Sequence, residues 1–227
     1  FVLFTSGSTG EPKGIVHSVG GYLLYAKYTC SKKFNISDKT TILTASDAGW
    51  INGHTYALYG PLSLGATTIL LEKPMSLIDK NLLKKILLDL KVNILYLPVT
   101  LIRLIKALNN RIQIKSKHLN LLGSMGEPLS KYVGYWFSKR FSTKQLQIVN
   151  TYFQTETGGI VSSPSFNDRI KNVPFGTVGK ALTKNLGVFI DKNNRKNKSE
   201  IKIKNPWPGC MINIINKENL FDEYWDK

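Results

Sequence analysis

The sequence predicts an α/β fold, with a layered αβα arrangement around a mostly parallel sheet and a smaller β-rich portion after it. Two observations predict this fold. Short apolar runs alternate with longer segments at helical spacing, which is the pattern of βαβ units. After Pro174 the pattern changes to short strands and turns. The 227 residues can bury a substantial core, and we divide them into a sheet region, 1–170, and a β-rich region, 171–227.

The first part of the chain predicts strands on either side of two helices. Phe1–Phe4 is an apolar run that ends at a Gly/Ser/Thr-rich loop, so it predicts a strand. The segment from His17 to about Tyr28 has helical spacing. Thr41–Ala45 and Ala66–Leu71 predict strands, and the aromatic and apolar segment Gly53–Leu64 between them predicts a buried helix.

The middle of the chain contains the clearest helix. Asp79–Leu90 has one apolar stripe at helical spacing, and Asp79 can cap its first turn. Val92–Leu97 predicts a compact buried strand, and Leu101–Leu108 predicts a second helix.

The remaining elements continue the alternation. Leu119–Leu122 predicts a strand, Leu129–Lys139 a helix that Ser130 can cap, and Leu146–Val149 another strand. Two further strands are predicted in the β-rich region, Leu186–Ile190 and Glu200–Lys204.

The chain is strongly basic, with 31 Lys and Arg against 15 Asp and Glu and a net charge of +16. Such a charge is compatible with nucleic acid or an anionic membrane as partner. The lysines are scattered, however, and no nucleic-acid-binding motif accompanies them; the abundance of Lys, Asn and Ile is what A/T-rich coding produces. We expect neither nucleic acid nor a membrane as partner, and no apolar run is long enough to predict a membrane span.

Cys30 and Cys210 are the two cysteines, and they lie far apart without metal-ligand spacing. We expect free, buried thiols in a reducing compartment, the cytoplasm. A disulfide between them stays an open alternative.

The segment from Thr5 to Gly14 combines features that suit a polyphosphate. Glycines let backbone N–H groups approach a ligand, hydroxyls add donors, and a lysine adds a positive charge. Pro12 and Gly14 flank the lysine, so the segment is not a Walker A loop. We expect it to join a strand to a helix; a flexible linker is the alternative. The candidate phosphate ligands are Thr5, Ser6, Gly7, Ser8, Thr9, Gly10 and Lys13.

Two further loops follow predicted strands, where ligands of parallel sheets bind. In Gly123–Pro128, Gly126 would let a flat base lie on the backbone; a plain strand-to-helix turn is the alternative. The loop Asn150–Gly159 offers aromatic, hydroxyl and amide groups and one carboxylate, Glu156, which is a suitable Mg²⁺ ligand beside a triphosphate. Its alternative is a short helix capped by Thr155 or Thr157.

Together the three loops resemble those of the adenylate-forming superfamily, and most closely those of the acetyl-CoA synthetase family of AMP-forming acyl-CoA synthetases. The resemblance covers nearly the whole chain. It rests on the segments Gly49–Tyr56, Asn93–Tyr96, Gly126–Pro128, Gln154–Gly159 and Pro206–Gly209. Departures are Tyr152 and Phe153 where the family carries two tryptophans, Asn150 where it usually has Asp, Asn52 in place of a usual Thr, and Met125.

The resemblance implies that ATP and a small carboxylic acid form an acyl-adenylate, from which CoA then displaces AMP. Lys13, Thr155 and Glu156 would be catalytic, with Lys13 on the β- and γ-phosphates and Glu156 on Mg²⁺. The residues implied for adenine and the α-phosphate are Gly126, Glu127, Pro128, Asn150, Thr151, Tyr152, Phe153, Gln154 and Thr155, with Asn52 in a region that also meets CoA.

The acid pocket is implied to consist of Ile51, Asn52, Met125 and Phe153. Phe153 stands where family members that use acetate place a bulkier Trp, so we expect a short acid, slightly larger than acetate. The polar amide of Asn52 suggests an acid with a hydroxyl or other polar group.

The resemblance also implies that this chain is an internal part of a large N-terminal adenylation domain, without the C-terminal lid domain that carries the adenylation lysine. We expect the isolated chain to lack ligase activity. Two alternatives stay open, an adenylating domain that loads a carrier protein and a non-catalytic nucleotide-binding remnant.

Overall fold

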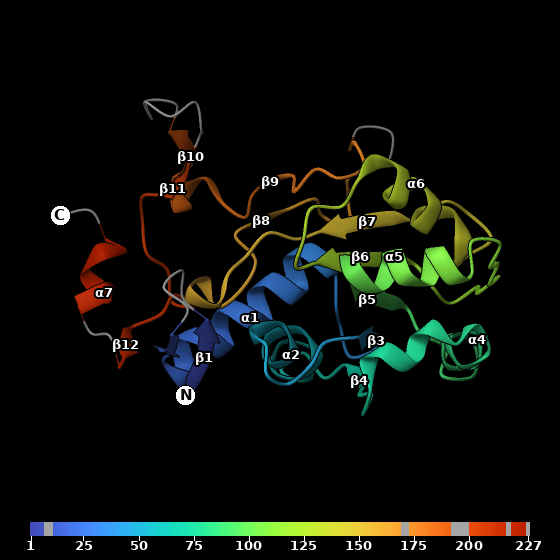
Figure 1. The fold of residues 1–227 in the computed structure, drawn as a ribbon, viewed down its shortest axis with the longest axis horizontal. Helices are drawn as coiled ribbons and strands as arrows, with labels where there is room; N and C mark the ends of the chain where they lie inside the picture. Colours follow the sequence, from blue (N-terminus) through green and yellow to red (C-terminus); the bar gives the residue numbers. More distant parts are fainter. Residues whose placement is uncertain (7–10, 169–172, 192–199, 217–218, 226–227) are drawn as a thin grey trace.

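A computed structural model describes residues 1–6, 11–168, 173–191, 200–216 and 219–225. Its centre is a five-stranded parallel sheet with the strand order β4-β3-β5-β6-β7 (Figure 1). Its strands are β3 (Thr41–Thr44), β4 (Thr67–Ile69), β5 (Ile94–Pro98), β6 (Leu121–Met125) and β7 (Gln147–Asn150). The parallel sheet that the sequence predicts is therefore confirmed.

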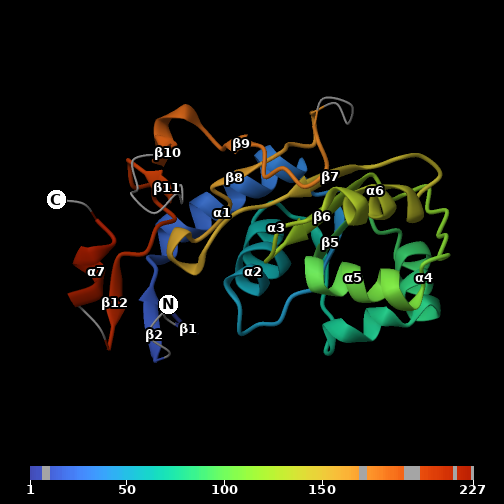
Figure 2. The same ribbon diagram turned by 45° about the horizontal axis from the view of Figure 1, so that its top comes forward.

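Helices cover both faces of this sheet, as predicted. One face carries α1 (Val19–Phe34) and the continuous helical segment α2 (Ile51–His54), η1 (Thr55–Tyr59) and α3 (Gly60–Leu62). The other carries the short η2 (Pro74–Ile78) with α4 (Lys80–Asp89), α5 (Val99–Leu108) and α6 (Lys131–Arg140). In Figure 2, β5 and β6 lie between α3 and α5.

Alternation along the central strands explains the two helical layers. Leu95 and Leu97 of β5 belong to a core cluster with α4, α5 and α6. Ile94 and Tyr96, which point the other way, belong to a cluster with α1 and η1. A strand buried on both faces reads as a continuous apolar run, which is why Val92–Leu97 was recognisable as a strand.

Two predicted helix caps are confirmed. The Asp79 carboxylate accepts a hydrogen bond from the Asn81 N–H at 2.8 Å. The Ser130 hydroxyl accepts one from the Val133 N–H at 3.3 Å. Each cap satisfies an N–H group of the first turn that has no partner inside the helix.

Strand β6 is longer than predicted, since it runs to Met125 instead of ending at Leu122. The sequence predicts a loop from Gly123 onward, but Gly123 lies inside the strand. A Cβ atom there would lie 2.3 Å from the Tyr96 ring on the neighbouring strand. The glycine therefore makes room for a buried aromatic side chain.

The N-terminal segment differs from the predicted strand, loop and helix. Val2–Ser6 (β1) and Pro12–Val16 (β2) form an antiparallel hairpin, and α1 begins only at Val19. Asn213–Ile215 (β12) pairs with the other edge of β2. The prediction that the first loop follows a strand of the parallel sheet is wrong because the β-branched pair Ile15 and Val16 extends the chain into a second strand.

Small elements complete the C-terminal part of the chain. β8 (Ser162–Ser163) pairs with β9 (Lys180–Ala181), and β10 (Val188–Asp191) pairs with β11 (Glu200–Ile203), all antiparallel. The short η5 (Lys184–Leu186) precedes β10, and α7 (Asn219–Glu223) follows β12. β10 and β11 correspond to the strands expected at Leu186–Ile190 and Glu200–Lys204.

Cys30 and Cys210 are both free and buried.

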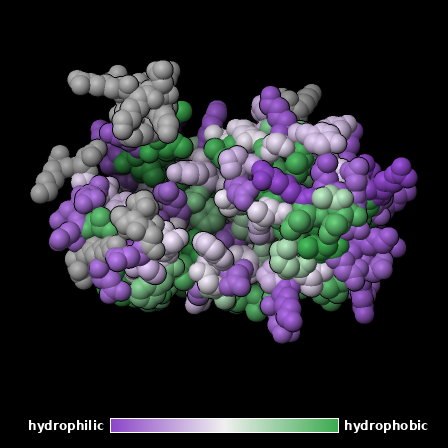
Figure 3. Space-filling model, viewed as in Figure 1, coloured by the Kyte–Doolittle hydropathy of each residue, from purple (hydrophilic) through white to green (hydrophobic). Residues whose placement is uncertain are grey.

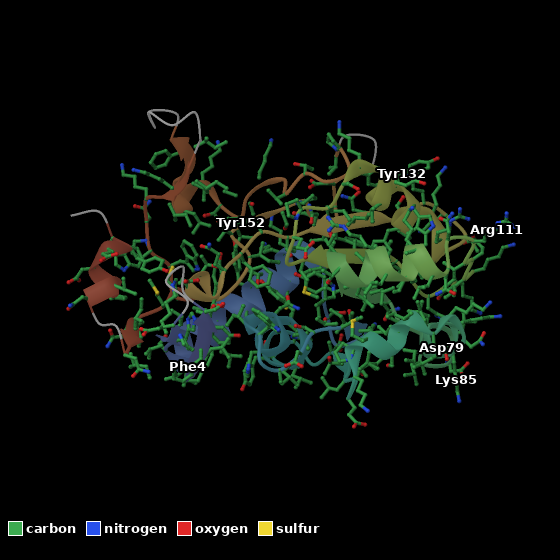
Figure 4. All side chains as sticks on the ribbon, in the orientation of Figure 1. Phe4, Asp79, Lys85, Arg111, Tyr132 and Tyr152 are labelled. Carbon is green, nitrogen blue, oxygen red and sulfur yellow. The ribbon has the colours of Figure 1, made fainter. Side chains whose placement is uncertain are left out.

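Hydrophilic side chains gather at the α4–α6 end of the molecule (Figure 3), where Lys85 and Arg111 lie far from Phe4 of the hairpin (Figure 4). None of the helices in the described ranges combines the length and the apolar character needed to cross a lipid bilayer.

Candidate active site

The second and third predicted loops start side by side at the carboxyl edge of the parallel sheet. Ser124 of β6 lies opposite Asn150 of β7 in the sheet register. The N–H of Thr151 donates to the Ser124 carbonyl at 2.9 Å. The two loops therefore leave neighbouring strands at the same edge of the sheet, and open α/β sheets bind ligands at this edge.

The first loop meets the third through an ion pair. Lys13 Nζ of β2 lies 2.8 Å from Glu156 Oε1, and the two side chains are only 8 % and 15 % exposed. The parallel sheet and the N-terminal hairpin are separate sheets, so this pair is where the two chemistry-bearing loops come together. Two of the three residues that the sequence predicts as catalytic are thus in direct contact.

Burial and partners act on this pair in opposite directions. Burial by itself lowers the pKa of Lys13 and raises the pKa of Glu156. The hydrogen bond and the attraction between the two groups, with contacts from Tyr224, outweigh burial. The pKa of Lys13 is therefore raised above 10.5 and the pKa of Glu156 is lowered below 4.5, so both groups are charged at neutral pH.

Tyr224, directly after α7, is a third member of this cluster. Its hydroxyl lies 3.0 Å from Glu156 Oε1 and also accepts a hydrogen bond from Lys13 Nζ. Sequence reasoning missed it, because a single tyrosine 68 residues beyond Glu156 matches no motif. Only the packing of α7 against the hairpin brings it here.

The turn that carries Glu156 is a short helix, η3 (Thr155–Thr157). The residue at its N-cap is Gln154, whose N–H donates to Thr157 Oγ1 at 2.9 Å. The alternative of a short helix is therefore present, with Gln154 rather than Thr155 or Thr157 at the N-cap position; Thr157 completes the cap as the third helical residue of a capping box. The helix and the carboxylate coexist, so the helix does not argue against a ligand at Glu156.

Backbone contacts hold this turn from two sides. His17, just after β2, contacts the Thr155 carbonyl through Nε2 at 2.8 Å. The N–H of Met211 donates to the Glu156 carbonyl at 2.8 Å, and Trp207 Nε1 donates to the Thr157 carbonyl at 3.1 Å. The Pro206–Gly209 turn thus has a structural role that its sequence did not reveal: Trp207 holds the backbone of the helical turn that carries Glu156.

Gly158 closes the turn in a conformation that requires glycine. Its φ is +67°, and a Cβ atom would lie 1.9 Å from the Gly209 carbonyl oxygen. Both the left-handed backbone and the close approach exclude larger residues. The paired glycines after Glu156 therefore permit its turn to pack on residues 207–211.

The second loop lies exposed beyond β6. Gly126 has φ +84°, and no atom lies within 4 Å of a Cβ built there. Glu127 pairs with Arg103 of α5 at 2.8 Å rather than with the Lys13–Glu156 pair. Gly126 thus has the open space that a flat base would need, while Glu127 contributes to a separate, solvent-exposed ion pair.

The residues predicted for adenine and α-phosphate differ in how far they are already engaged. Asn150 is buried; its Oδ1 accepts from Ser124 Oγ at 2.9 Å, and its Nδ2 donates to the carbonyls of Gly176 and Thr177. Thr151 Oγ1 lies 2.6 Å from the Tyr96 hydroxyl. Their contact with a nucleotide stays a prediction, and Asn150 would have to share its amide with these partners.

Tyr152 and Phe153 lie between the sheet edge and η3. Tyr152 pairs with Ser162 in an isolated antiparallel bridge and is half-buried (Figure 4). Burial, and to a lesser extent the charge of Glu156, raise its pKa. The Phe153 ring packs edge-on against Tyr56 at 5.5 Å between centroids.

Two of the four residues predicted for the acid pocket, Met125 and Phe153, lie in or against the apolar cluster that contains Tyr56: Met125 is buried in it, and Phe153 packs against it. Ile51 and Asn52 are buried in α2, and Asn52 precedes Tyr56 by one helical turn, on the same face. Neither the Oδ1 nor the Nδ2 atom of Asn52 has a hydrogen-bond partner among the described residues.

The remaining first-loop residues are only partly described. Thr5 lies opposite Lys13 in the hairpin, so the two side chains share a face, and Ser6 lies opposite Pro12. The expected ligands Gly7, Ser8, Thr9 and Gly10 lie outside the described residues.

The residues present fit a magnesium nucleotide better than a metal held by protein alone. The described residues contain no group of three His, Cys, Asp or Glu side chains that could hold a metal ion. Mg²⁺ commonly takes one or two carboxylates and completes its shell with phosphate and water oxygens. Glu156 can supply such a carboxylate, with Lys13 beside it for a phosphate.

A cavity of about 860 Å³ lies elsewhere, at the opposite, amino edge of β6 and β7. Its lining includes Asn120, Gln147 and Phe175 and none of the predicted site residues. Ligands of parallel sheets bind at the carboxyl edge, so this volume does not locate the nucleotide site.

The chain is similar to known proteins over nearly its whole length. A family model described as AMP-binding enzyme matches residues 1–211. Acetyl-coenzyme A synthetase of Vibrio vulnificus (strain YJ016) is 36 % identical over 230 residues, which cover 98 % of this chain and 35 % of the relative. The protein of that name from Helicobacter pylori (strain P12) is 35 % identical over 240 residues, covering 100 % and 35 %. The chain thus spans about a third of the length of these curated relatives.

Proposed function

The chain belongs to the AMP-binding enzyme family, and from this premise we propose that it is part of an AMP-forming ligase. The ligase would activate a small carboxylic acid with ATP to an acyl-adenylate and transfer the acyl group to CoA. The observation that carries the proposal is the contact of Lys13 with Glu156, which sets a cation for phosphate beside a carboxylate for magnesium.

The chemistry asks mainly for positioning and charge neutralisation. The substrate carboxylate attacks the α-phosphorus and pyrophosphate leaves, so negative charge moves onto the leaving group. Lys13 would hold the outer phosphates, Glu156 would bind a magnesium ion that neutralises phosphate charge, and Thr155 would contribute its hydroxyl near the α-phosphate. Thr5 shares the face of Lys13 and adds a hydroxyl on the same side.

The nucleoside would lie along the sheet edge between the second and third loops. Gly126 leaves open space for the base. Gln154, which directly precedes η3 in the chain, is exposed. The acid would lie on the other side of the Thr151–Phe153 segment, against Met125 and Tyr56.

Two residues of the proposed acid pocket define its substrate. Phe153 packs on Tyr56 and limits the length of the acyl chain. Asn52 is 5 % exposed and both of its amide atoms lack partners among the described residues. A buried unpaired amide costs about 1–3 kcal/mol, which a polar ligand group would recover. We therefore propose a short acid that carries a hydroxyl or another polar group.

Two other functions remain as alternatives, an adenylating domain that loads a carrier protein and a nucleotide-binding protein without catalysis. The similarity to acetyl-coenzyme A synthetases favours CoA as acceptor. Because the chain spans about a third of those relatives, we propose that the 227 residues alone do not catalyse acyl-CoA formation.

Calorimetric titration of the 227-residue chain with ATP and Mg²⁺ tests the nucleotide site. We expect binding that weakens at least tenfold in the Lys13→Met variant and is unchanged in Lys85→Met, whose lysine is exposed on α4 at the far end of the molecule (Figure 4). Equal affinity of all three chains would overturn the proposal.

A second experiment tests the reaction in a longer protein that contains this chain. Pyrophosphate release is measured with a panel of small acids, with and without CoA. Short polar acids should release pyrophosphate fastest, and acyl-CoA should appear with CoA present. A preference for hexanoate or longer acids would contradict the proposed pocket.

A further inference from the structure

Tyr224 contacts both members of the Lys13–Glu156 pair. Lys13 Nζ donates to the phenol oxygen, and the phenol O–H donates to Glu156 Oε1 at 3.0 Å. Lys13 Nζ also lies 4.7 Å from the centre of the Tyr224 ring. The three side chains thus form a closed triangle of hydrogen bonds in which each group touches the other two.

The position of Tyr224 is set by α7. Leu220 and Phe221 of this helix pack against Ile15 of β2, Met211 and Ile214. Tyr224 follows the helix, and its own side chain remains 44 % exposed. Burial of the ring therefore explains little of its placement, whereas its hydroxyl meets two charged groups.

The closed triangle makes the pair a poor ligand set until it opens. One carboxylate oxygen of Glu156, Oε1, already accepts from both Lys13 and Tyr224. The ammonium that would face a phosphate is held by the same two groups. A phosphate alone would draw Lys13 away and leave the Glu156 carboxylate buried without a cation. A magnesium ion alone would leave the Lys13 ammonium buried without an anion. Each unpaired buried charge costs a large free energy.

We propose that Tyr224 is a positioning residue that latches Lys13 to Glu156, so that nucleotide and magnesium bind together rather than singly. This inference rests on the proposed nucleotide site. When both ligands arrive, Lys13 exchanges Glu156 for phosphate and Glu156 exchanges Lys13 for the metal, so neither charge is left unpaired. The Tyr224 hydroxyl stabilises the closed pair and thereby increases the dependence of each ligand on the other.

The Tyr224→Phe variant tests the latch because it removes only the hydroxyl and keeps the ring over Lys13. Tyr132→Phe is the matched control, since the Tyr132 ring also lies beside a lysine, with Lys106 Nζ 4.2 Å from its centre, but on α6. Both chains should unfold at the temperature of the parent within a few degrees, which excludes a general loss of structure.

The first readout needs no nucleotide. Acetic anhydride labels lysines in proportion to their free, accessible amine, and mass spectrometry of peptides gives the rate at each position. Lys13 should be labelled severalfold faster in Tyr224→Phe than in the parent, with Lys85 as the internal reference. An unchanged rate at Lys13 would overturn the latch.

The second readout is calorimetric affinity for ATP with Mg²⁺ and for ATP with a chelator. In Tyr224→Phe we expect ATP without Mg²⁺ to bind about five- to tenfold more tightly than in the parent, so that the advantage given by Mg²⁺ shrinks. Weaker binding in both conditions would make Tyr224 a ligand contact and overturn the latch. If Lys13 is labelled faster in Tyr224→Phe but no chain binds nucleotide, the proposed function and the ligand coupling are both overturned. Tyr224 would then still be a residue that holds Lys13 against Glu156.

Discussion

The ammonium of Lys13 lies 2.8 Å from a carboxylate oxygen of Glu156, although the two residues are 143 positions apart in the chain. Lys13 lies on strand β2 of the N-terminal sheet and Glu156 in the short helix η3, and both side chains are largely buried. The two charges of a buried pair satisfy each other but have both lost their hydration. Removing one partner therefore destabilises the fold more than it would in a surface pair.

This dependence predicts strong non-additivity. Lys13→Met should lower the free energy of unfolding by about 3 kcal/mol, because it leaves Glu156 buried without a cation. Glu156→Gln should also destabilise, and the double variant should lose clearly less than the sum of the two single losses. Urea unfolding of the four chains measures the coupling. Losses that simply add would show that the two groups do not interact in solution.

The pair also predicts a pH window for stability. The pKa of Glu156 is lowered, so its contribution is present above 4.5 and is lost as the pH falls through its folded value. The pKa of Lys13 is raised, so its contribution is present below 10.5 and is lost as the pH rises through its folded value. The stability difference between the parent and the variant with Lys13→Met and Glu156→Gln should be flat between these limits and shrink outside them. A difference that varies between pH 6 and 9 would contradict this assignment.

Gly158 predicts a sharp contrast between two glycine substitutions. Gly158→Ala should destabilise by about 3 kcal/mol, since φ is +67° and the new Cβ would meet the Gly209 carbonyl oxygen. Gly20→Ala is the control, because Gly20 lies in α1 with nothing within 4 Å of a Cβ, and it should stabilise by up to about 1 kcal/mol. Thermal and urea unfolding compare the two; similar effects would mean that the turn is not packed as described.

The size of Phe153 predicts the length of the acid. In a longer protein that contains this chain, Phe153→Trp should shift kcat/KM toward acetate over propionate by about tenfold, because the larger ring fills the space beside Tyr56. Phe189→Trp is the control, since Phe189 is exposed on β10. An unchanged ratio in Phe153→Trp would place the acid elsewhere.

Asn52 predicts a trade between stability and selectivity. Asn52→Leu should raise the free energy of unfolding by about 1 kcal/mol, because two buried polar atoms without partners are replaced by apolar ones. In the longer protein the same change should lower the ratio of lactate to propionate activation. A stability loss, or an unchanged ratio, would show that water or protein groups satisfy this amide.

The sheet and its helices were predictable because their signals are local. Val92–Leu97 and the capped helix from Asp79 depend on residues next to one another in the chain. The second strand of the hairpin was missed because the glycine- and lysine-rich segment before Ile15 favoured a loop. Its pairing with β12 depends on residues near the other end of the chain, which local patterns cannot report.

The candidate site divides in the same way. Lys13 and Glu156 are each predicted from their own loop, and the structure adds the distance between them. Tyr224 and the support given by Trp207 and Met211 were not found, since each acts through a single contact with a distant segment. Asn150 shows the opposite case, a residue whose loop suggests a ligand but whose amide is already engaged by Ser124.

The place of β2 between β1 and β12 has a consequence for biosynthesis. A ribosome releases the lysine-bearing strand among the earliest residues of this segment, but the strand that covers its second edge, and the tyrosine after α7, emerge nearly last. Until β12 has been synthesised, one edge of β2 stays unpaired while the parallel sheet assembles. An unpaired strand edge favours binding by chaperones or pairing with a wrong strand. Completion of the Lys13–Glu156–Tyr224 cluster is therefore coupled to translation of the distal end of this segment.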